Sequence, residues 1–175
     1  DETLMEHYFD KGELDEDEMR AGLNLGMMKR TCFPVFCLSA LRNMGSGRLM
    51  GFIDNVASSA TEMPAEELEG GGSLKCQTDG PTVLFTFKTV IEPHAGHISL
   101  FKVMSGTVKE GMELTNDNTG NIERINQLFI MEGKERKHVN LLEAGDIGGT
   151  IKLKETSTGH TLHSPGKGIK LVPLA

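Results

Sequence analysis

The sequence predicts an α+β protein in two parts, a partial α/β domain over residues 1–57 and a small antiparallel β-barrel over residues 82–175. Three observations lead to this prediction. Helical periodicity surrounds one short apolar run in the first part, which gives the order helix, strand, helix. After Pro81, short alternating segments separated by glycines are typical of a barrel or sandwich. Between the two parts, residues 58–81 have the glycine-rich and proline-containing composition of a linker.

The first 28 residues are expected to form two helices. Apolar residues at helical spacing precede Gly12, which should end the first helix. The acidic stretch 15–18 favours the start of a second helix, because negative charge suits the positive end of the helix dipole. Met19, Leu23 and Met27 then mark one apolar stripe.

The nearly unbroken apolar run Cys32–Leu38 predicts a strand that is buried on both faces of a parallel sheet. A third helix follows over residues 49–56, with Ser46 as its expected cap. One strand is not a sheet, so this domain is incomplete. An apolar strand with unpaired backbone groups is a template for another chain, and we therefore expect residues 1–57 to self-associate or to be poorly ordered.

The second part is expected to consist of strands throughout. Val83, Phe85 and Phe87 alternate with Leu84, Thr86 and Lys88, which is consistent with a strand, and residues 92–96 should form the turn to the next strand. Turn residues then separate further strand candidates, at 98–103, 112–115, 122–131, 139–142, 148–153 and 169–172. This barrel is expected to fold without the rest of the chain.

Charge and cysteine content limit the possible functions. Residues 1–81 hold 15 acidic and 7 basic side chains, whereas residues 82–175 hold 10 acidic and 11 basic ones. Neither part has the strong positive charge of a protein that binds naked nucleic acid by itself. There is no apolar run near eighteen residues, so no membrane partner is expected. Three cysteines are too few for a disulfide framework and predict reduced thiols in a cytoplasmic protein.

No catalytic residues can be assigned. The glycine pair Gly106 and Gly111 has the spacing of a phosphate-binding loop, but Met112 and Glu113 follow it in place of Lys and Ser or Thr. Without those side chains the loop can neither reach phosphates nor hold Mg²⁺. An Asn-Lys-x-Asp sequence for guanine recognition is also absent from the sequence. The chain itself is therefore expected to bind no GTP tightly and to need no cofactor.

Metal binding is an alternative that the spacing disfavours. Two His-x-x-His pairs lie in turn-rich segments, and Cys32 and Cys37 lie on an apolar run where cysteine behaves as a small hydrophobe. Neither set has the cysteine spacing of a zinc site. We expect no metal ligand.

One dense basic cluster, residues 134–138, falls in a predicted hairpin loop of the second part. Lys134, Arg136 and Lys137 could contact phosphate groups there. A solvated loop tip is an equally good interpretation of the same charges.

The order of several segments resembles the elongation factor G family of ribosome-dependent translational GTPases. The match covers nearly the whole chain outside the linker. Residues 4–9, 13–14 and the acidic helix resemble the late part of the GTPase domain, and 34–45 looks like its fifth guanine-nucleotide motif. The segments that resemble the second domain are 85–88, 92–96, 101–106, 142–148 and 153–162.

This resemblance implies a fragment of a ribosomal translocation GTPase, in which a translation-factor β-barrel follows the end of the GTPase domain. It implies that Ser39, Ala40 and Leu41 edge the guanine pocket of the intact protein, with the Ala40 N–H as donor to the base. GTP and Mg²⁺ would then be cofactors of the intact protein. The barrel would dock on the GTPase domain and on the RNA of the small ribosomal subunit.

Three other functions stay open. A ribosomal-protection protein shares both domains and would differ only in biological outcome. A stand-alone β-barrel module that binds RNA or protein is a second alternative, although an apolar strand in residues 1–57 makes sense only beside absent neighbours. A metalloenzyme is the third.

Overall fold

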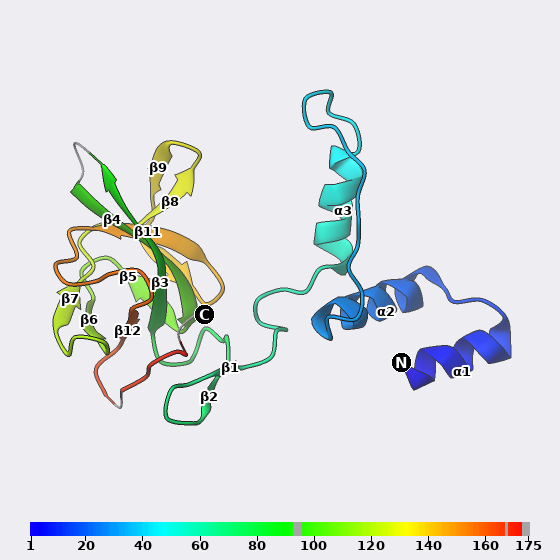
Figure 1. The fold of residues 1–175 in the computed structure, drawn as a ribbon, viewed down its shortest axis with the longest axis horizontal. Helices are drawn as coiled ribbons and strands as arrows, with labels where there is room; N and C mark the ends of the chain where they lie inside the picture. The colour runs from blue at the N-terminus through cyan, green and yellow to red at the C-terminus, as the bar shows by residue number, and fades with distance from the viewer. Residues whose placement is uncertain (93–95, 167, 173–175) are drawn as a thin grey trace. The chain divides into compact units, whose positions relative to one another are not determined.

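The computed structural model describes residues 1–92, 96–166 and 168–172. The chain divides into two compact units, Asp1–Ser59 and Ala60–Ala175. Figure 1 shows three helices in the first unit and a set of strands in the second. Among the described residues, no helix is long and apolar enough to cross a membrane.

The first two helices begin and end close to where the sequence predicts. Helix α1 spans Glu2–Lys11, and Gly12 follows it in the left-handed conformation that glycine adopts readily. Helix α2 spans Glu16–Met28 behind a complete capping box, in which Asp15 accepts from the Glu18 N–H and Glu18 accepts from the Asp15 N–H. At the acidic start of α2, Asp15 and Glu18 therefore cap the helix in addition to providing favourable charge.

Glu18 joins the two helices electrostatically. Its carboxylate accepts from the Asp15 N–H at 3.0 Å and lies 2.8 Å from His7 Nδ1 and 3.3 Å from Lys11 Nζ. The backbone hydrogen bond first, and then His7 and Lys11, lower the pKa of Glu18 from 4.5 to about 2.

A lowered carboxyl pKa means that its stabilising effect is present above pH 4.5 and is lost as the pH falls toward 2. We therefore expect the amides of the first turn of α2 to lose hydrogen-exchange protection over this range. Carboxyl-detected NMR on the whole chain should place the Glu18 midpoint near the lower end. A Glu18→Gln variant should show no such step, and an identical profile in both proteins would refute the coupling.

The run Cys32–Leu38 does not form a strand, and this part of the sequence prediction is wrong. The segment is extended, with Val35 89% exposed, and the Phe36 ring packs edge-on against Phe52 of α3 at 4.9 Å. A strand needs a neighbour to satisfy its N–H and C=O groups, and the described part of the chain places none beside it. Self-association of this exposed segment stays a prediction.

Helix α3 spans Ser46–Val56, as expected, but its cap differs from the prediction. Gly45 occupies the capping position at φ 80°, and no side chain caps the helix, so the assignment of Ser46 as cap is wrong. A Cβ on Gly45 would lie 3.1 Å from Leu38 Cβ and 3.2 Å from the Cys37 carbonyl oxygen. Glycine here allows both the left-handed conformation and this close approach.

The second unit is an antiparallel sheet that curls around one interior. Its eight-stranded sheet has the order β7-β6-β12-β3-β4-β11-β8-β9, and β10 pairs separately with β5. The strands are β3 Val83–Glu92, β4 Gly96–Ser105, β5 Thr107–Lys109, β6 Glu113–Asn116, β7 Ile122–Arg124, β8 Phe129–Glu132, β9 Glu135–His138, β10 Leu141–Glu143, β11 Ile147–Ile151 and β12 Thr161–His163. Side chains from the strands and from the segments between them fill the interior, namely Leu84, Phe101, Val103, Val108, Leu114, Ile125, Leu128, Leu142, Leu153 and Leu162.

The strand predictions hold for most of this unit, and two of the expected strands differ in the structure. The expected single strand 122–131 is interrupted between β7 and β8, where the Ile125 and Leu128 side chains enter the core. The expected strand 169–172 is reduced to a bridge between Leu171 and Leu68. The turn predicted at 92–96 falls largely on 93–95, outside the described residues.

The stretch 58–81 is largely folded onto the barrel. Strands β1 Glu66–Glu67 and β2 Ser73–Leu74 pair as a hairpin, and the glycine triplet 70–72 turns between them with positive φ angles. Leu74 packs with Val83 and Leu171 in a second apolar cluster. The boundary between the units therefore lies near Ser59, and the hairpin packs on the barrel through Leu68 and Leu74.

Candidate functional site

The loop 39–44 holds the three residues that the sequence assigns to a nucleotide pocket. Ser39 and Met44 exchange two backbone hydrogen bonds of 2.9 and 3.0 Å, and the Asn43 N–H donates to the Ala40 carbonyl at 3.1 Å. The N–H groups of Ala40 and Leu41 have no acceptor among the described residues. Leu41 is 98% exposed. The turn therefore presents free backbone donors at its tip.

The predicted basic cluster lies on the hairpin β8–β9, with Lys134 in the turn and Arg136 and Lys137 on the edge strand. The strand continues through most of the segment that the sequence predicts as a loop. Carboxylates neutralise two of its charges: Arg136 pairs with Glu92 of β3, and Lys137 Nζ lies 3.3 Å from Glu132 Oε1 at the end of β8.

His138 Nε2 lies 2.8 Å from Glu110 Oε2, at hydrogen-bonding distance. Of the three basic residues Lys134, Arg136 and Lys137, only Lys134 makes no ion pair within the described residues. The sequence cluster is therefore nearly neutral in three dimensions.

Arg136 also covers an aromatic ring. Its guanidinium lies 5.7 Å from the centre of the Phe129 ring, which is a cation–π distance. The Phe129 ring occupies the space over Gly149, where a Cβ would come within 2.5 Å of it. Arg136 is thus held by Glu92 and Phe129 together, and it is less available to a partner than its sequence context suggests.

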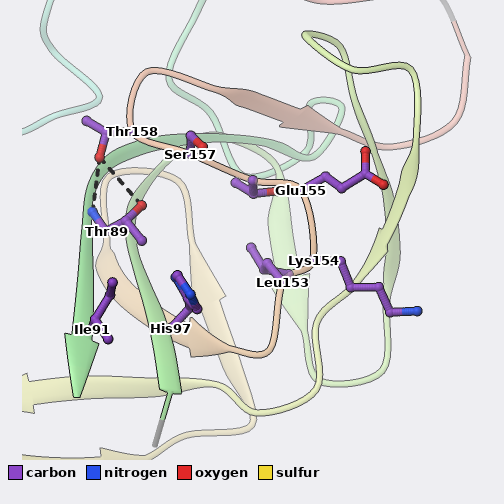
Figure 2. Close-up of a pocket in the computed structure, with 9 residues that line it drawn as sticks. Thr89, Ile91, His97, Leu153, Lys154, Glu155, Ser157 and Thr158 are labelled. Carbon is purple, nitrogen blue, oxygen red and sulfur yellow. Dashed lines mark hydrogen bonds between the residues drawn. The ribbon is translucent and has the colours of Figure 1, made fainter. Parts of the chain in front are cut away.

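One hollow of the barrel unit lies at one end of strands β3 and β4. It has a volume of about 510 Å³ and is lined by Thr89, Ile91, His97 and residues 153–158. Figure 2 shows Ile91 and His97 on neighbouring strands, with the Lys154 and Glu155 side chains extending away from them. The Thr89 N–H donates to Thr158 Oγ1 at 3.0 Å and so ties the loop to β3 (Figure 2).

A buried carboxylate holds the loop that forms this hollow. Glu123 is only 4% exposed, although it lies on the three-residue strand β7. Its oxygens accept from the N–H groups of Lys154 and Glu155 at 3.0 and 2.7 Å, and from Thr156 Oγ1 at 3.1 Å. Sequence reasoning missed Glu123, because a charged residue on a short strand normally predicts exposure.

The loop is also anchored through Asn116, which is fully buried. Its Nδ2 lies 3.2 Å from Thr156 Oγ1 and 3.1 Å from His160 Nδ1. The Ser157 N–H also donates to His160 Nδ1, so this nitrogen acts as an acceptor. His160 is therefore a structural group of the loop.

The remaining histidines of the two pairs do not meet. His163 is buried and donates from Nδ1 to the Ser164 carbonyl, with its Nε2 3.4 Å from Asp117 Oδ1. His97 lines the hollow, and His94 lies outside the described residues. Within the described residues, no three His, Cys, Asp or Glu side chains form a group that could hold a metal ion.

These features define a β-barrel module with a packed interior, in which buried hydrogen bonds hold the loop 153–158. In the chain it follows a helical unit whose loop 39–44 has backbone N–H groups without an acceptor among the described residues. Residues 81–165 match the family described as elongation factor G domain 2. The barrel is therefore a member of this domain family, and the resemblance seen in the sequence is confirmed for it.

Among solved structures, a protein from Thermus thermophilus is similar to 96% of this chain, with 24% sequence identity and a TM-score of 0.75. This likeness confirms the fold class, which is three helices followed by a mostly antiparallel barrel. The chain spans 23% of the length of that protein.

Proposed function

We propose that this chain is a segment of a ribosomal translocation GTPase of the elongation factor G type, working in the cytoplasm. The observation that carries the proposal is the match of residues 81–165 to elongation factor G domain 2. The order of the two units agrees with it, because a helical unit with a guanine-motif-like loop precedes the barrel. In this role the barrel is a binding module and not itself a catalyst.

In the intact protein, Ser39, Ala40 and Leu41 would edge the guanine pocket. The free N–H of Ala40 supports this role, because a backbone donor without an internal acceptor is available to a base oxygen. Bound GTP and Mg²⁺ would need phosphate and metal ligands from other parts of the protein, since the chain has no phosphate-binding loop. The exposed Phe33, Val35 and Leu41 would be covered by the rest of the GTPase domain.

The barrel would contact the RNA of the small ribosomal subunit. Lys134, Arg136 and Lys137 are the candidates from sequence. Lys134 is free to contact a phosphate, whereas Arg136 and Lys137 would first have to exchange a carboxylate for it. A ribosomal-protection protein would use the same two units and the same kind of contact.

A stand-alone β-barrel module that binds RNA or another protein is the alternative from a different class. The apolar side chains exposed in residues 1–59 argue against a stand-alone module. A helical extension of a complete protein would be expected to bury Val35 and Leu41, which are exposed to water here.

Co-sedimentation of the whole chain with purified ribosomal subunits tests the proposal. We expect retention with the small subunit at low salt, weakening as the salt concentration rises, because the contact is with phosphates. The large subunit and an unrelated acidic protein serve as controls. Absence of binding to the small subunit at low salt would contradict the proposed role of the barrel.

A further inference from the structure

The outer face of strands β3 and β4 carries two lysines that no carboxylate of the described residues neutralises. Lys102 lies opposite Phe85, and Lys88 lies opposite Leu100, two residues before Lys102 on the same strand. The lysines are therefore diagonal neighbours, at a typical Cα separation of about 7–8 Å. Neither forms an ion pair or a side-chain hydrogen bond within the described part of the chain.

Strand alternation places both side chains on the outside. Phe101 and Val103 are fully buried in the barrel interior, so Lys102 between them points outward. The pairing shifts by one residue between Thr86 and Lys88. This bulge leaves Phe87 without a partner residue and 37% exposed, next to Lys88.

The charge balance of this face differs from that of the β8–β9 hairpin. The three adjacent strands β3, β4 and β11 contain a single carboxylate, Glu92, and Arg136 already occupies it. Two like charges at diagonal positions repel each other, and nothing in these strands relieves that repulsion. An anion brought by a partner would relieve it. At the hairpin only Lys134 is free, and an anion at Arg136 or Lys137 would have to displace Glu92 or Glu132.

We propose that the RNA contact of the barrel is centred on Lys88 and Lys102, with Phe87 beside them, and not on the β8–β9 hairpin. The inference rests on the proposed function and names the surface that serves it. The partner is a sugar–phosphate backbone: two free ammonium groups suit successive phosphates, and an exposed aromatic ring next to them suits a ribose or an unstacked base.

The test is a matched pair of double variants of the whole chain, K88Q/K102Q and K134Q/K137Q, each of which removes two positive charges. Binding to small ribosomal subunits is measured at several salt concentrations. We expect K88Q/K102Q to weaken binding about tenfold or more and to lower the salt slope by about 2. The hairpin variant should change both quantities much less. Melting curves confirm that both variants are folded.

A second measurement uses the unaltered chain and so does not depend on the folding of variants. Amine acetylation, read by mass spectrometry, should be slowed by bound subunits at Lys88 and Lys102 and not at Lys134. Equal losses in the two double variants, or protection at Lys134 alone, would overturn the assignment. Weaker binding without any change of salt slope would point to a ribosomal protein and would overturn the RNA partner. If the unaltered chain bound no subunit, the proposed function itself would fall, and this surface with it.

Discussion

A barrel fragment that begins at residue 82 is expected to be less stable than one that begins at residue 60, by about 3–5 kcal/mol. The sequence alone placed residues 58–81 in a linker and predicted that 82–175 folds by itself. In the structure, Leu74 from this stretch packs on Val83, which is fully buried, and on Leu171. Truncation would expose this cluster to water.

Truncation would also remove polar partners. The Gln77 carbonyl accepts from the Gly106 N–H at 2.8 Å, and the Glu69 N–H donates to the Lys170 carbonyl at 2.8 Å. The Gly106 N–H cannot easily reach another acceptor, because Gly106 packs closely against the backbone of Thr82. An unsatisfied N–H in such a place costs about 1–3 kcal/mol.

Urea denaturation of the two fragments measures the difference. Within the longer fragment, Leu74→Ala should by itself lower the free energy of unfolding by about 2–4 kcal/mol. The control variant is Val172→Ala, which should change it little because Val172, next to Leu171, is half exposed. Equal midpoints for the two fragments, together with a neutral Leu74→Ala, would mean that the hairpin β1–β2 does not stabilise the barrel.

The sequence predicted reliably those features that depend on interactions between neighbouring residues. Gly12 ends α1 because a left-handed residue is needed there, and the acidic residues before α2 are its caps. Alternation identified β3 as a strand but not its inner face. Leu84 enters the main core, whereas Val83 and Phe85 pack in the second apolar cluster and Phe87 is 37% exposed. Such features depend on a few neighbouring residues, and the sequence displays them directly.

Features that depend on a distant partner could not be predicted. The run Cys32–Leu38 has the composition of a central strand, but strand formation needs neighbours, and the described residues supply none. The composition of the glycine triplet 70–72 indicated a linker. The bridge between the nearby Leu68 and the distant Leu171 could not be predicted, because local composition does not show it. In the basic cluster at 134–138, Arg136 is neutralised by Glu92, which lies 44 residues away in sequence.

The candidate site divides in the same way. The loop 39–44 was assigned to a guanine pocket through its resemblance to a motif, and that role stays a prediction. Its tip has backbone N–H groups without an acceptor among the described residues. Lys88 and Lys102 look like ordinary solvated lysines in the sequence. Only the register of β3 and β4 shows that they are neighbours, and only the fold shows that Glu92 is already occupied.

Replacement of Glu123 by alanine is expected to destabilise the barrel by about 3–5 kcal/mol. The carboxylate is 4% exposed and accepts from two backbone N–H groups and one hydroxyl. Alanine would leave these donors of Lys154, Glu155 and Thr156 without an acceptor in a partly buried place. Because Thr156 also contacts Asn116, the whole loop around the hollow should loosen.

The control is Glu113→Ala on the neighbouring strand β6, where the side chain is exposed. It should change the free energy of unfolding by less than about 0.5 kcal/mol. Glu123→Gln keeps one acceptor oxygen and should fall between the two. Chemical denaturation gives the stabilities, and hydrogen exchange at the amides of Lys154 and Glu155 reports the loop directly. If Glu123→Ala left both the unfolding midpoint and those amides unchanged, Glu123 would not be what holds the loop, and Asn116 with His160 would have to suffice.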